Sequence, residues 1–366
     1  MLKKVPNVDT IYILIDVEEF EKNTNLKYLE QEKEKALLVA TNNASEKHMI
    51  TISNNTFQIL PNGSHGYNYI LRNNSYEVKI AQKRAKLEAF YPIQIRISSE
   101  CLWSYGLLNS WGMIYNWIVE VFGNIIRHKV CRIDLCCHVS DMDFISNYNL
   151  CYKGKFKKRE VFYSGDCINA ITFGSRKNKK IYCRIYNKTL EIQETKKKEW
   201  FKDIWTRNNM NINNVWNIEF ELKGDILREF NIVEINTINN HLKDLWHYCT
   251  NYYLVKVNRT NKRIERCKIN NEWLDIQSAY DVFLSTGLIE RKKQLDIDAS
   301  NLIPSIVGFI TSYSARRGEI DIRNAFDCIY NDSERFLKNK QTDFEKEVKN
   351  KMSLIGKRGL ENGEWR

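Results

Sequence analysis

The chain has 366 residues, of which 43% are hydrophobic and 12% aromatic. A chain this apolar can bury a large core, which excludes a disordered tail protein. No segment approaches about eighteen uncharged apolar residues, so we expect no transmembrane helix and no membrane partner. The ten cysteines are dispersed, and the N-terminus lacks the apolar run of a signal peptide. We therefore predict reduced, mostly buried thiols in a cytoplasmic protein.

The positive charge is concentrated in one stretch of the chain. The formal net charge is +11, and residues 153–207 hold sixteen Lys and Arg residues against six acids. A focused positive field attracts polyanions, so this window favours a nucleic-acid partner. The alternative is an ordinary charged surface in contact with water.

The first third of the chain predicts a small α+β unit. Asn62-Gly63, the strongest short hairpin signal, separates two segments that alternate apolar and polar residues. In chain order the expected elements are a strand at 9–17, a helix at 18–40, strands at 48–60, 65–82 and 91–98, and a helix at 104–126.

The rest of the chain predicts further strands and then mainly helices. The expected strands are 130–139, 168–174, 180–189 and 215–223, with a charged helix at 190–207. The expected helices that follow are 225–231, 238–256, 276–286, 300–316 and 320–352. We predict an α+β fold with a mainly antiparallel sheet covered by helices. The predicted regions are an N-terminal α+β region at 1–126, a sheet domain at 127–290 and a helical C-terminal region at 291–366.

The strand that contains Tyr186 gathers unusual side chains on one face. Alternation places Tyr182, Arg184, Tyr186 and Lys188 together, an arrangement that an ordinary core strand would not have. A free phenol has a pKa near ~10 and is a poor nucleophile at neutral pH. Neighbouring cations favour the phenolate and can also hold a phosphate oxygen. Tyr186 is therefore a candidate nucleophile.

Two other predicted strands carry acids among apolar residues. Asp134 shares a strand face with His138, and Glu219 shares one with Glu221. An acid in an apolar strand is costly unless it is paired or bound to a metal. Carboxylate and imidazole ligands suit Mg²⁺ or Mn²⁺, which would polarise a phosphate. The alternative is a set of structural salt bridges with basic residues, namely Arg132, Arg184 and Lys223.

Three segments in order resemble the Rep_trans type of plasmid rolling-circle replication initiators, a group that includes conjugative-transposon relaxases. The segments are Arg-Ile-Asp-Leu at 132–135, Phe-Gly-Ser-Arg at 173–176 followed by Tyr-Cys-Arg-Ile-Tyr-Asn-Lys at 182–188, and Asn-Ile-Glu-Phe-Glu-Leu at 217–222. The resemblance spans about residues 90–350. It implies an HUH-like antiparallel catalytic sheet, so that region 127–290 would be the nicking domain.

The resemblance implies a replication initiation protein that nicks DNA at a specific site in a metal-dependent reaction. A tyrosine attacks a phosphodiester, stays linked to the 5′ phosphate and frees a 3′-OH for rolling-circle replication. By match, Tyr186 is the nucleophile, and Arg184 and Lys188 bind phosphate. Tyr182 is a weaker candidate, because it lies outside the matching Arg-Ile-Tyr-Asn-Lys segment. The matching candidate ligands for Mg²⁺ or Mn²⁺ are Asp134 and Glu219, with His138 and Glu221 as further candidates.

The chain departs from the family pattern at two positions. His138 stands where many relatives have a second acid, and it is open as a ligand, a general base or a plain polar strand residue. Asn217 stands where relatives often have Arg. Both departures leave the metal-ligand set open.

The predicted partners are DNA, as the origin double strand and the nicked single strand, together with a second copy of the chain and a host helicase. Basic residues of the turn before the Tyr186 strand are the expected DNA contacts, namely Arg176, Lys177, Lys179 and Lys180. The alternatives are a relaxase for conjugative transfer, a catalytically inactive DNA-binding regulator, or an RNA-binding module that stacks bases on aromatics. The joint presence of Tyr186, Asp134 and Glu219 favours the enzyme.

Overall fold

The protein forms two compact units, residues 1–292 and residues 293–366. The computed structural model describes residues 2–43, 46–84, 90–142, 151–177, 180–287 and 302–360, without the side chains of 353–360. The regions predicted at 1–126 and 127–290 both lie in the first unit. They are joined because β1 (Lys3–Val17) pairs with β7 (Ile125–Ser140) along nearly its whole length.

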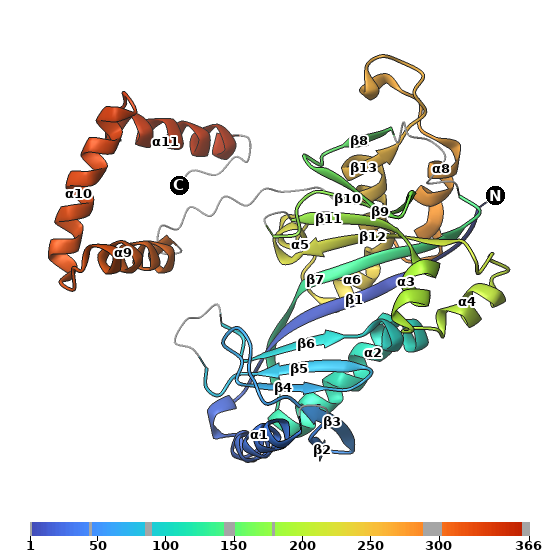
Figure 1. Ribbon diagram of the computed structural model, residues 1–366, viewed down its shortest axis with the longest axis horizontal. Helices are drawn as coiled ribbons and strands as arrows, with labels where there is room; N and C mark the ends of the chain where they lie inside the picture. The colour runs from blue at the N-terminus through green and yellow to red at the C-terminus, as the bar shows by residue number, and fades with distance from the viewer. Residues whose placement is uncertain are drawn as a thin grey trace. The chain divides into compact units, whose positions relative to one another are not determined.

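An eleven-stranded antiparallel sheet organises the first unit (Figure 1). Its strand order is β2-β3-β4-β5-β6-β1-β7-β12-β11-β10-β9, so the two long strands lie in the middle. The other strands are β2 (Met49–Ile52), β3 (Asn55–Ile59), β4 (Tyr69–Arg72), β5 (Tyr76–Ile80), β6 (Ile93–Ile97), β9 (Arg159–Ser164), β10 (Cys167–Phe173), β11 (Ile181–Asn187) and β12 (Val215–Lys223). A separate two-stranded sheet consists of β8 (Tyr152–Gly154) and β13 (Leu254–Lys256).

Helices complete both units, and the predicted α+β class with a mainly antiparallel sheet is confirmed. The first unit contains α1 (Asn25–Asn42), α2 (Ser99–Phe122), α3 (Lys188–Thr195), α4 (Phe201–Arg207), α5 (Gly224–Glu229), α6 (Ile235–Asn240), α7 (Leu242–Tyr248) and α8 (Asn271–Gln277), with short helical turns at Phe20–Lys22, Cys249–Tyr253, Ile264–Arg266 and Ser278–Val282. The second unit contains α9 (Ile303–Arg317), α10 (Ile322–Asn339) and α11 (Phe344–Leu360).

Several predicted elements differ from the structure. The strands expected at 48–60 and 65–82 are each divided, into β2 and β3 and into β4 and β5. The helix expected at 320–352 is divided into α10 and α11, and the helix expected at 276–286 is α8 followed by a short helical turn.

The helix expected at 190–207 is divided into α3 and α4, because Lys196 and Lys198 adopt left-handed backbone angles, with φ of 53° and 60°, which end a helix. The helix expected at 238–256 stops before Leu254, because β13 pairs there with β8. A distant strand therefore overrides the local pattern.

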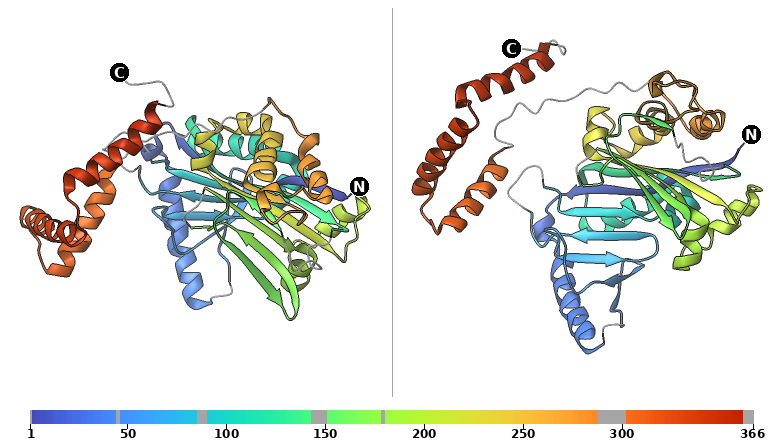
Figure 2. Two further views of the ribbon diagram at one scale, coloured as in Figure 1. Left: turned by 90° about the horizontal axis from the view of Figure 1, so that it is seen from above. Right: turned by 45° about the horizontal axis from the view of Figure 1, so that its top comes forward.

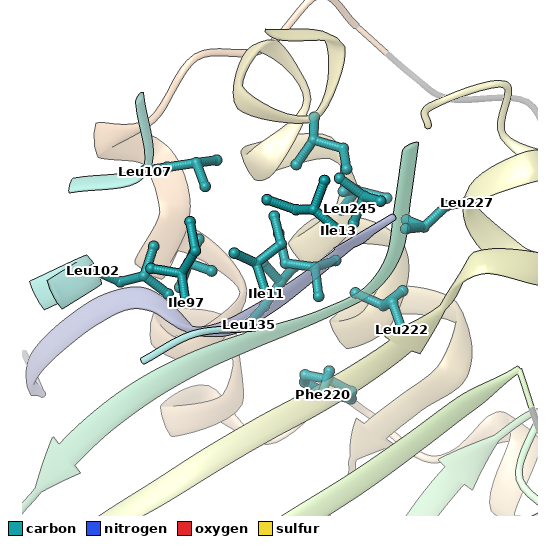
Figure 3. Packing of buried hydrophobic residues seen from close by; sticks show 14 of the residues in the cluster. Ile11, Ile13, Ile97, Leu102, Leu107, Leu135, Phe220, Leu222, Leu227 and Leu245 are labelled. Atoms are coloured by element: carbon teal, nitrogen blue, oxygen red, sulfur yellow. The ribbon is translucent and has the colours of Figure 1, made fainter. Parts of the chain in front are cut away.

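The main core lies on one face of the large sheet, and a second, smaller buried cluster is formed by Ile192, Phe201, Trp205, Met210 and Val215 around α3 and α4. Helix α2 packs on β1 and β6, and α5 packs on β7 and β12. Figure 2 shows these helices gathered with α6, α7 and α8 over the same face. Figure 3 shows the resulting contact layer. Its labelled members are Ile11, Ile13, Ile97, Leu102, Leu107, Leu135, Phe220, Leu222, Leu227 and Leu245.

Because side chains alternate along a strand, burying one face presents the other residues on the opposite face. In β7, Ile133 and Leu135 are fully buried in the core, so Arg132 and Asp134 point to the other side of the sheet. A slip of one residue would exchange the two sets. The apolar core thus fixes which polar residues share a face.

The second unit is helical, as predicted. Tyr313 and Arg317 of α9 both bond to Asp332 of α10, the arginine at 2.7 Å, which joins these two helices. In the described part of the chain, no helix combines the length and apolar character needed to cross a membrane. All ten cysteines are free and seven of them are buried, which confirms the predicted free thiols.

Candidate active site

The sheet register brings the three predicted motifs together on the face opposite the core. Strand β12 lies between β7 and β11. Arg184 stands opposite Glu219, and Tyr186 stands opposite Asn217. Glu221 in turn stands opposite the residue Asp134. Since directly paired residues have Cβ atoms only about 5 Å apart, these side chains form one polar cluster.

The hydroxyl group of Tyr186 has three polar partners. It donates to Glu219 Oε2 at 3.3 Å, and it accepts from Asn217 Nδ2 at 3.0 Å and from Lys188 Nζ at 3.2 Å. The guanidinium of Arg184 lies over the ring, 5.2 Å from its centre. The residue is only half-buried, while its hydroxyl end is enclosed by these partners. The arrangement offers the phenol a proton acceptor and two donors that stabilise negative charge on its oxygen.

The pKa of Tyr186 is set by burial and by its charged neighbours. Burial raises the pKa of the phenol well above its ordinary value, and the negative charges of Glu219 and Glu191 raise it further. Arg184 opposes this rise but does not outweigh it. Arg184 thus favours the phenolate, as predicted, but burial and the acids outweigh it, so the phenol keeps its proton in the protein alone. The proton must leave during the attack, and Glu219 is the base within hydrogen-bond distance.

Arginines hold the acids of the cluster. Arg132 donates to both oxygens of Asp134, at 2.8 and 2.6 Å, and also lies 2.9 Å from Glu221. Arg184 donates to Glu219 at 2.6 Å. Burial raises the pKa of Asp134 to about 7 against the hydrogen bonds from Arg132, and the two glutamates add to the rise. In this structure the acids thus form the salt bridges of the alternative interpretation.

A divalent metal fits the chemistry of the cluster but not its present arrangement. Among the described residues, no three His, Cys, Asp or Glu side chains are placed to hold a metal ion together. The oxygens of Asp134, Glu219 and Glu221 are the kind that Mg²⁺ and Mn²⁺ prefer. Burial and, to a smaller extent, the two glutamates raise the pKa of Asp134, and a bound cation would favour its ionised form. Binding would require Arg132 or Arg184 to move aside.

His138 does not join the carboxylates. Its side chain is fully buried, and its Nδ1 accepts a hydrogen bond from Trp205 Nε1 at 3.0 Å. The ring stacks on Trp103, with centroids 4.9 Å apart, and meets Phe201 edge-on at 4.6 Å. Burial lowers the pKa of the imidazole well below its ordinary value, so His138 is neutral. Helix α4 supplies two walls of this aromatic pocket, which the local sequence around His138 does not show.

The basic turn before β11 is partly neutralised by acids. Arg176 and Lys180 are exposed, but Arg176 donates to Glu221 at 3.0 Å and Lys180 pairs with Glu229. Lys177 is exposed as well. The fourth predicted DNA contact, Lys179, lies outside the described residues.

Sequence reasoning missed Asn217 as a partner of Tyr186. Asn217 is fully buried and donates both to the phenol and to Glu219 Oε2, the latter at 3.3 Å. The available signal was its position two residues before Glu219, which places both side chains on the same strand face.

Fold and site together define an α+β protein whose antiparallel sheet carries a tyrosine among acids and cations on the face away from the core. No family model matches the sequence, and no curated protein matches it. A solved structure to which the chain is similar is a rolling circle replication initiator protein from Geobacillus stearothermophilus. The TM-score is 0.45 at 16% identity, covering 79% of this chain and 99% of that chain. Likeness at this level assigns no activity, so the function must be argued from the site.

Proposed function

We propose that this chain is a replication initiation protein that nicks DNA at a specific site through attack of Tyr186 on a phosphodiester. One observation carries the proposal. The Tyr186 hydroxyl contacts a carboxylate acceptor, Glu219 Oε2, and two nitrogen donors from Asn217 and Lys188. A structural tyrosine needs one such partner, whereas a nucleophile needs a base for its proton and donors for its developing charge.

The reaction exchanges one phosphate ester for another. As the Tyr186 oxygen bonds to phosphorus, its proton passes to Glu219 Oε2, and Lys188 and Asn217 stabilise the oxygen. The bond from phosphorus to the 3′ oxygen breaks, and that oxygen takes up a proton to become the free 3′-OH. The products are a 5′-phosphotyrosine link and the primer end for rolling-circle replication. Arg184 beside the ring is placed to hold a phosphate oxygen.

We also infer that the reaction requires Mg²⁺ or Mn²⁺ held by Asp134, Glu219 and Glu221. A bound divalent ion would polarise the scissile phosphate and neutralise charge that develops there. The support is the chemistry of the three carboxylates and the raised pKa of Asp134. DNA is the proposed partner, and the exposed basic turn supports this because cations on a surface meet phosphates. The homodimer and the host helicase stay predictions.

The test is nicking of a supercoiled plasmid that carries the DNA flanking the coding sequence, in buffer with Mg²⁺ or Mn²⁺. The parent protein should relax the plasmid and form a covalent protein–DNA adduct. Tyr186→Phe removes one hydroxyl and should abolish both, while it still binds DNA. Tyr182→Phe is the matched control, because Tyr182 lies on the same strand opposite Glu221.

An adduct formed by Tyr186→Phe would contradict the assignment. DNA binding by the parent without nicking in either metal would instead favour the inactive DNA-binding regulator. Nicking that supports transfer between cells but not plasmid maintenance would favour the conjugative relaxase.

A further inference from the structure

Two buried polar atoms beside Tyr186 lack a hydrogen-bond partner in the described part of the chain. They are Nε2 of His138 and Oδ1 of Asn217, and both side chains are fully buried. Nearly all buried polar atoms in proteins are hydrogen-bonded. Two unpaired atoms so close to one reactive group therefore need an explanation.

The unpaired atom of His138 is a donor. Its Nδ1 accepts from Trp205 Nε1 at 3.0 Å, and because an indole N–H can only donate, that Nδ1 carries no proton. Burial keeps the imidazole neutral by lowering its pKa. A neutral imidazole has one proton, which must lie on Nε2.

The unpaired atom of Asn217 is an acceptor. Its Nδ2 donates to the Tyr186 hydroxyl at 3.0 Å and to Glu219 Oε2 at 3.3 Å. The reversed amide would place Oδ1 against the carboxylate of Glu219, with two acceptors facing each other. The hydrogen-bond network therefore settles the amide orientation and leaves the lone pairs of Oδ1 unused.

The donor and the acceptor belong to residues on neighbouring strands. His138 of β7 is the register partner of Asn217 of β12, so their Cβ atoms lie about 5 Å apart on the same face of the sheet. Since neither atom contacts a partner among the described residues, we propose that His138 Nε2–H is hydrogen-bonded to Asn217 Oδ1 through one buried water molecule. His138 is then a positioning residue that acts through Asn217, which itself contacts the Tyr186 oxygen, an inference that rests on the proposed nicking function.

The proposed bond completes a chain of hydrogen bonds from Trp205 through His138 and Asn217 to Tyr186. Trp205 fixes the tautomer of His138, and His138 fixes the amide of Asn217. The Asn217 N–H then occupies one lone pair of the Tyr186 oxygen and leaves the phenol proton directed at Glu219. Without His138 the amide is free to rotate, and the phenol loses a donor and its orientation.

The first test is spectroscopic and independent of nicking. In protein labelled with ¹⁵N-histidine, His138 should show the Nε2–H tautomer with a slowly exchanging proton, and His138→Phe identifies its signal. Asn217→Leu should shift that proton and speed its exchange. Asn217→Ala replaces it if the leucine variant does not fold. His48→Phe is the control, because His48 pairs with Glu32, outside the cluster. An Nδ1–H tautomer, or a proton unaffected by either Asn217 variant, would overturn the proposal.

The second test is a double-mutant cycle on the single-turnover rate of plasmid nicking. His138→Phe and Asn217→Leu should each slow nicking roughly 10- to 100-fold at unchanged DNA affinity. The double variant should be no slower than the slower single variant, because both break the same bond. If the two single slowdowns multiply in the double variant, the two residues act independently and the proposed coupling is wrong. Nicking by Tyr186→Phe would reject the proposed function and leave the spectroscopic result on this bond standing.

Discussion

Replacing Asp134 with Asn tests the electrostatics of the candidate site. Asp134 is 2% exposed, and burial raises its pKa from the ordinary 3.8 to about 7. Between these two values the folded protein binds more protons than the unfolded chain. The contribution of Asp134 to stability is therefore fully present below pH 3.8 and falls as the pH rises to about 7.

The size of the effect follows from the two pKa values. A shift of about three units, at about 1.4 kcal/mol per unit, corresponds to about 4 kcal/mol of stability lost between pH 4 and pH 8. Asn does not titrate and keeps the volume of the side chain. Asp134→Asn should match the parent near pH 4 and exceed it by up to about 4 kcal/mol at pH 8.

The assay is urea unfolding from pH 4 to pH 8 in chelator, comparing the free energies of parent and variant. Glu77→Gln is the control. Burial acts to raise the pKa of Glu77, but Arg72 and Arg96 hold it below its ordinary value. The contribution of Glu77 to stability is lost only as the pH falls through that lowered pKa. The difference in unfolding free energy between Glu77→Gln and the parent should therefore be constant above about pH 5. A pH-independent difference for Asp134→Asn, or lower stability of that variant at pH 8, would refute the reasoning.

The same experiment with Mg²⁺ or Mn²⁺ tests the metal site without any activity measurement. An ion bound beside Asp134 favours the ionised carboxylate, so it should lower the pKa of that group and flatten the pH dependence of the parent. It should also stabilise the parent in proportion to the logarithm of its concentration. Asp134→Asn should respond much less. Equal responses of both proteins would place the ion elsewhere.

Three further predictions concern catalysis and DNA binding. Arg184→Met should cost about 1–2 kcal/mol in urea unfolding, less than a fully buried pair because the side chain is 35% exposed, and should cut nicking at least roughly tenfold. Nicking should stop in chelator and return with Mg²⁺ or Mn²⁺, and nicking that survives thorough chelation would exclude the metal. Changing Lys177, Lys179 and Lys180 to Gln should make the log–log salt dependence of DNA binding shallower by about 0.7–0.9 per lost phosphate contact. Because Lys180 already pairs with an acid, we expect the slope to become shallower by about one to two in total. An unchanged slope would show that the turn faces water.

The fold and the shared face of the site follow from patterns within single strands. In β7, β11 and β12, apolar residues alternate with polar ones, and this period of two fixes which side chains share a face wherever one face is buried. Tyr186, Arg184 and Glu219 were therefore predictable as neighbours once the strands were paired.

The partners that long-range packing supplies were not predictable. Trp205 reaches His138 from a helix 67 residues further along the chain, and no local pattern shows that contact. Each acid could also bind either a metal or an arginine, and composition alone does not decide between these two partners. The outcome depends on which arginine side chains are long enough and close enough to contact the acid. Arg132 extends to Asp134 on its own strand and to Glu221 on the next.

The pairing of His138 with Asn217 also has a physical meaning. The two residues are register partners, and both are fully buried. A neutral imidazole opposite an amide offers a hydrogen-bond donor to an acceptor. Neither side chain carries a charge, which would be costly at a fully buried position.

Charge balance finally links DNA binding to the uptake of a cation or a proton. The cluster sets three acids, Asp134, Glu219 and Glu221, against three arginines, which are Arg132, Arg176 and Arg184. A phosphate that enters must compete for those arginines, and every arginine it takes leaves a buried carboxylate less well compensated. With a pKa of about 7, Asp134 can accept a proton near neutral pH, and a divalent ion relieves the same charge. DNA affinity should therefore rise as the pH falls toward 6 in chelator and lose that dependence in Mg²⁺. A pH-independent affinity in chelator would mean that the phosphate does not contact these arginines.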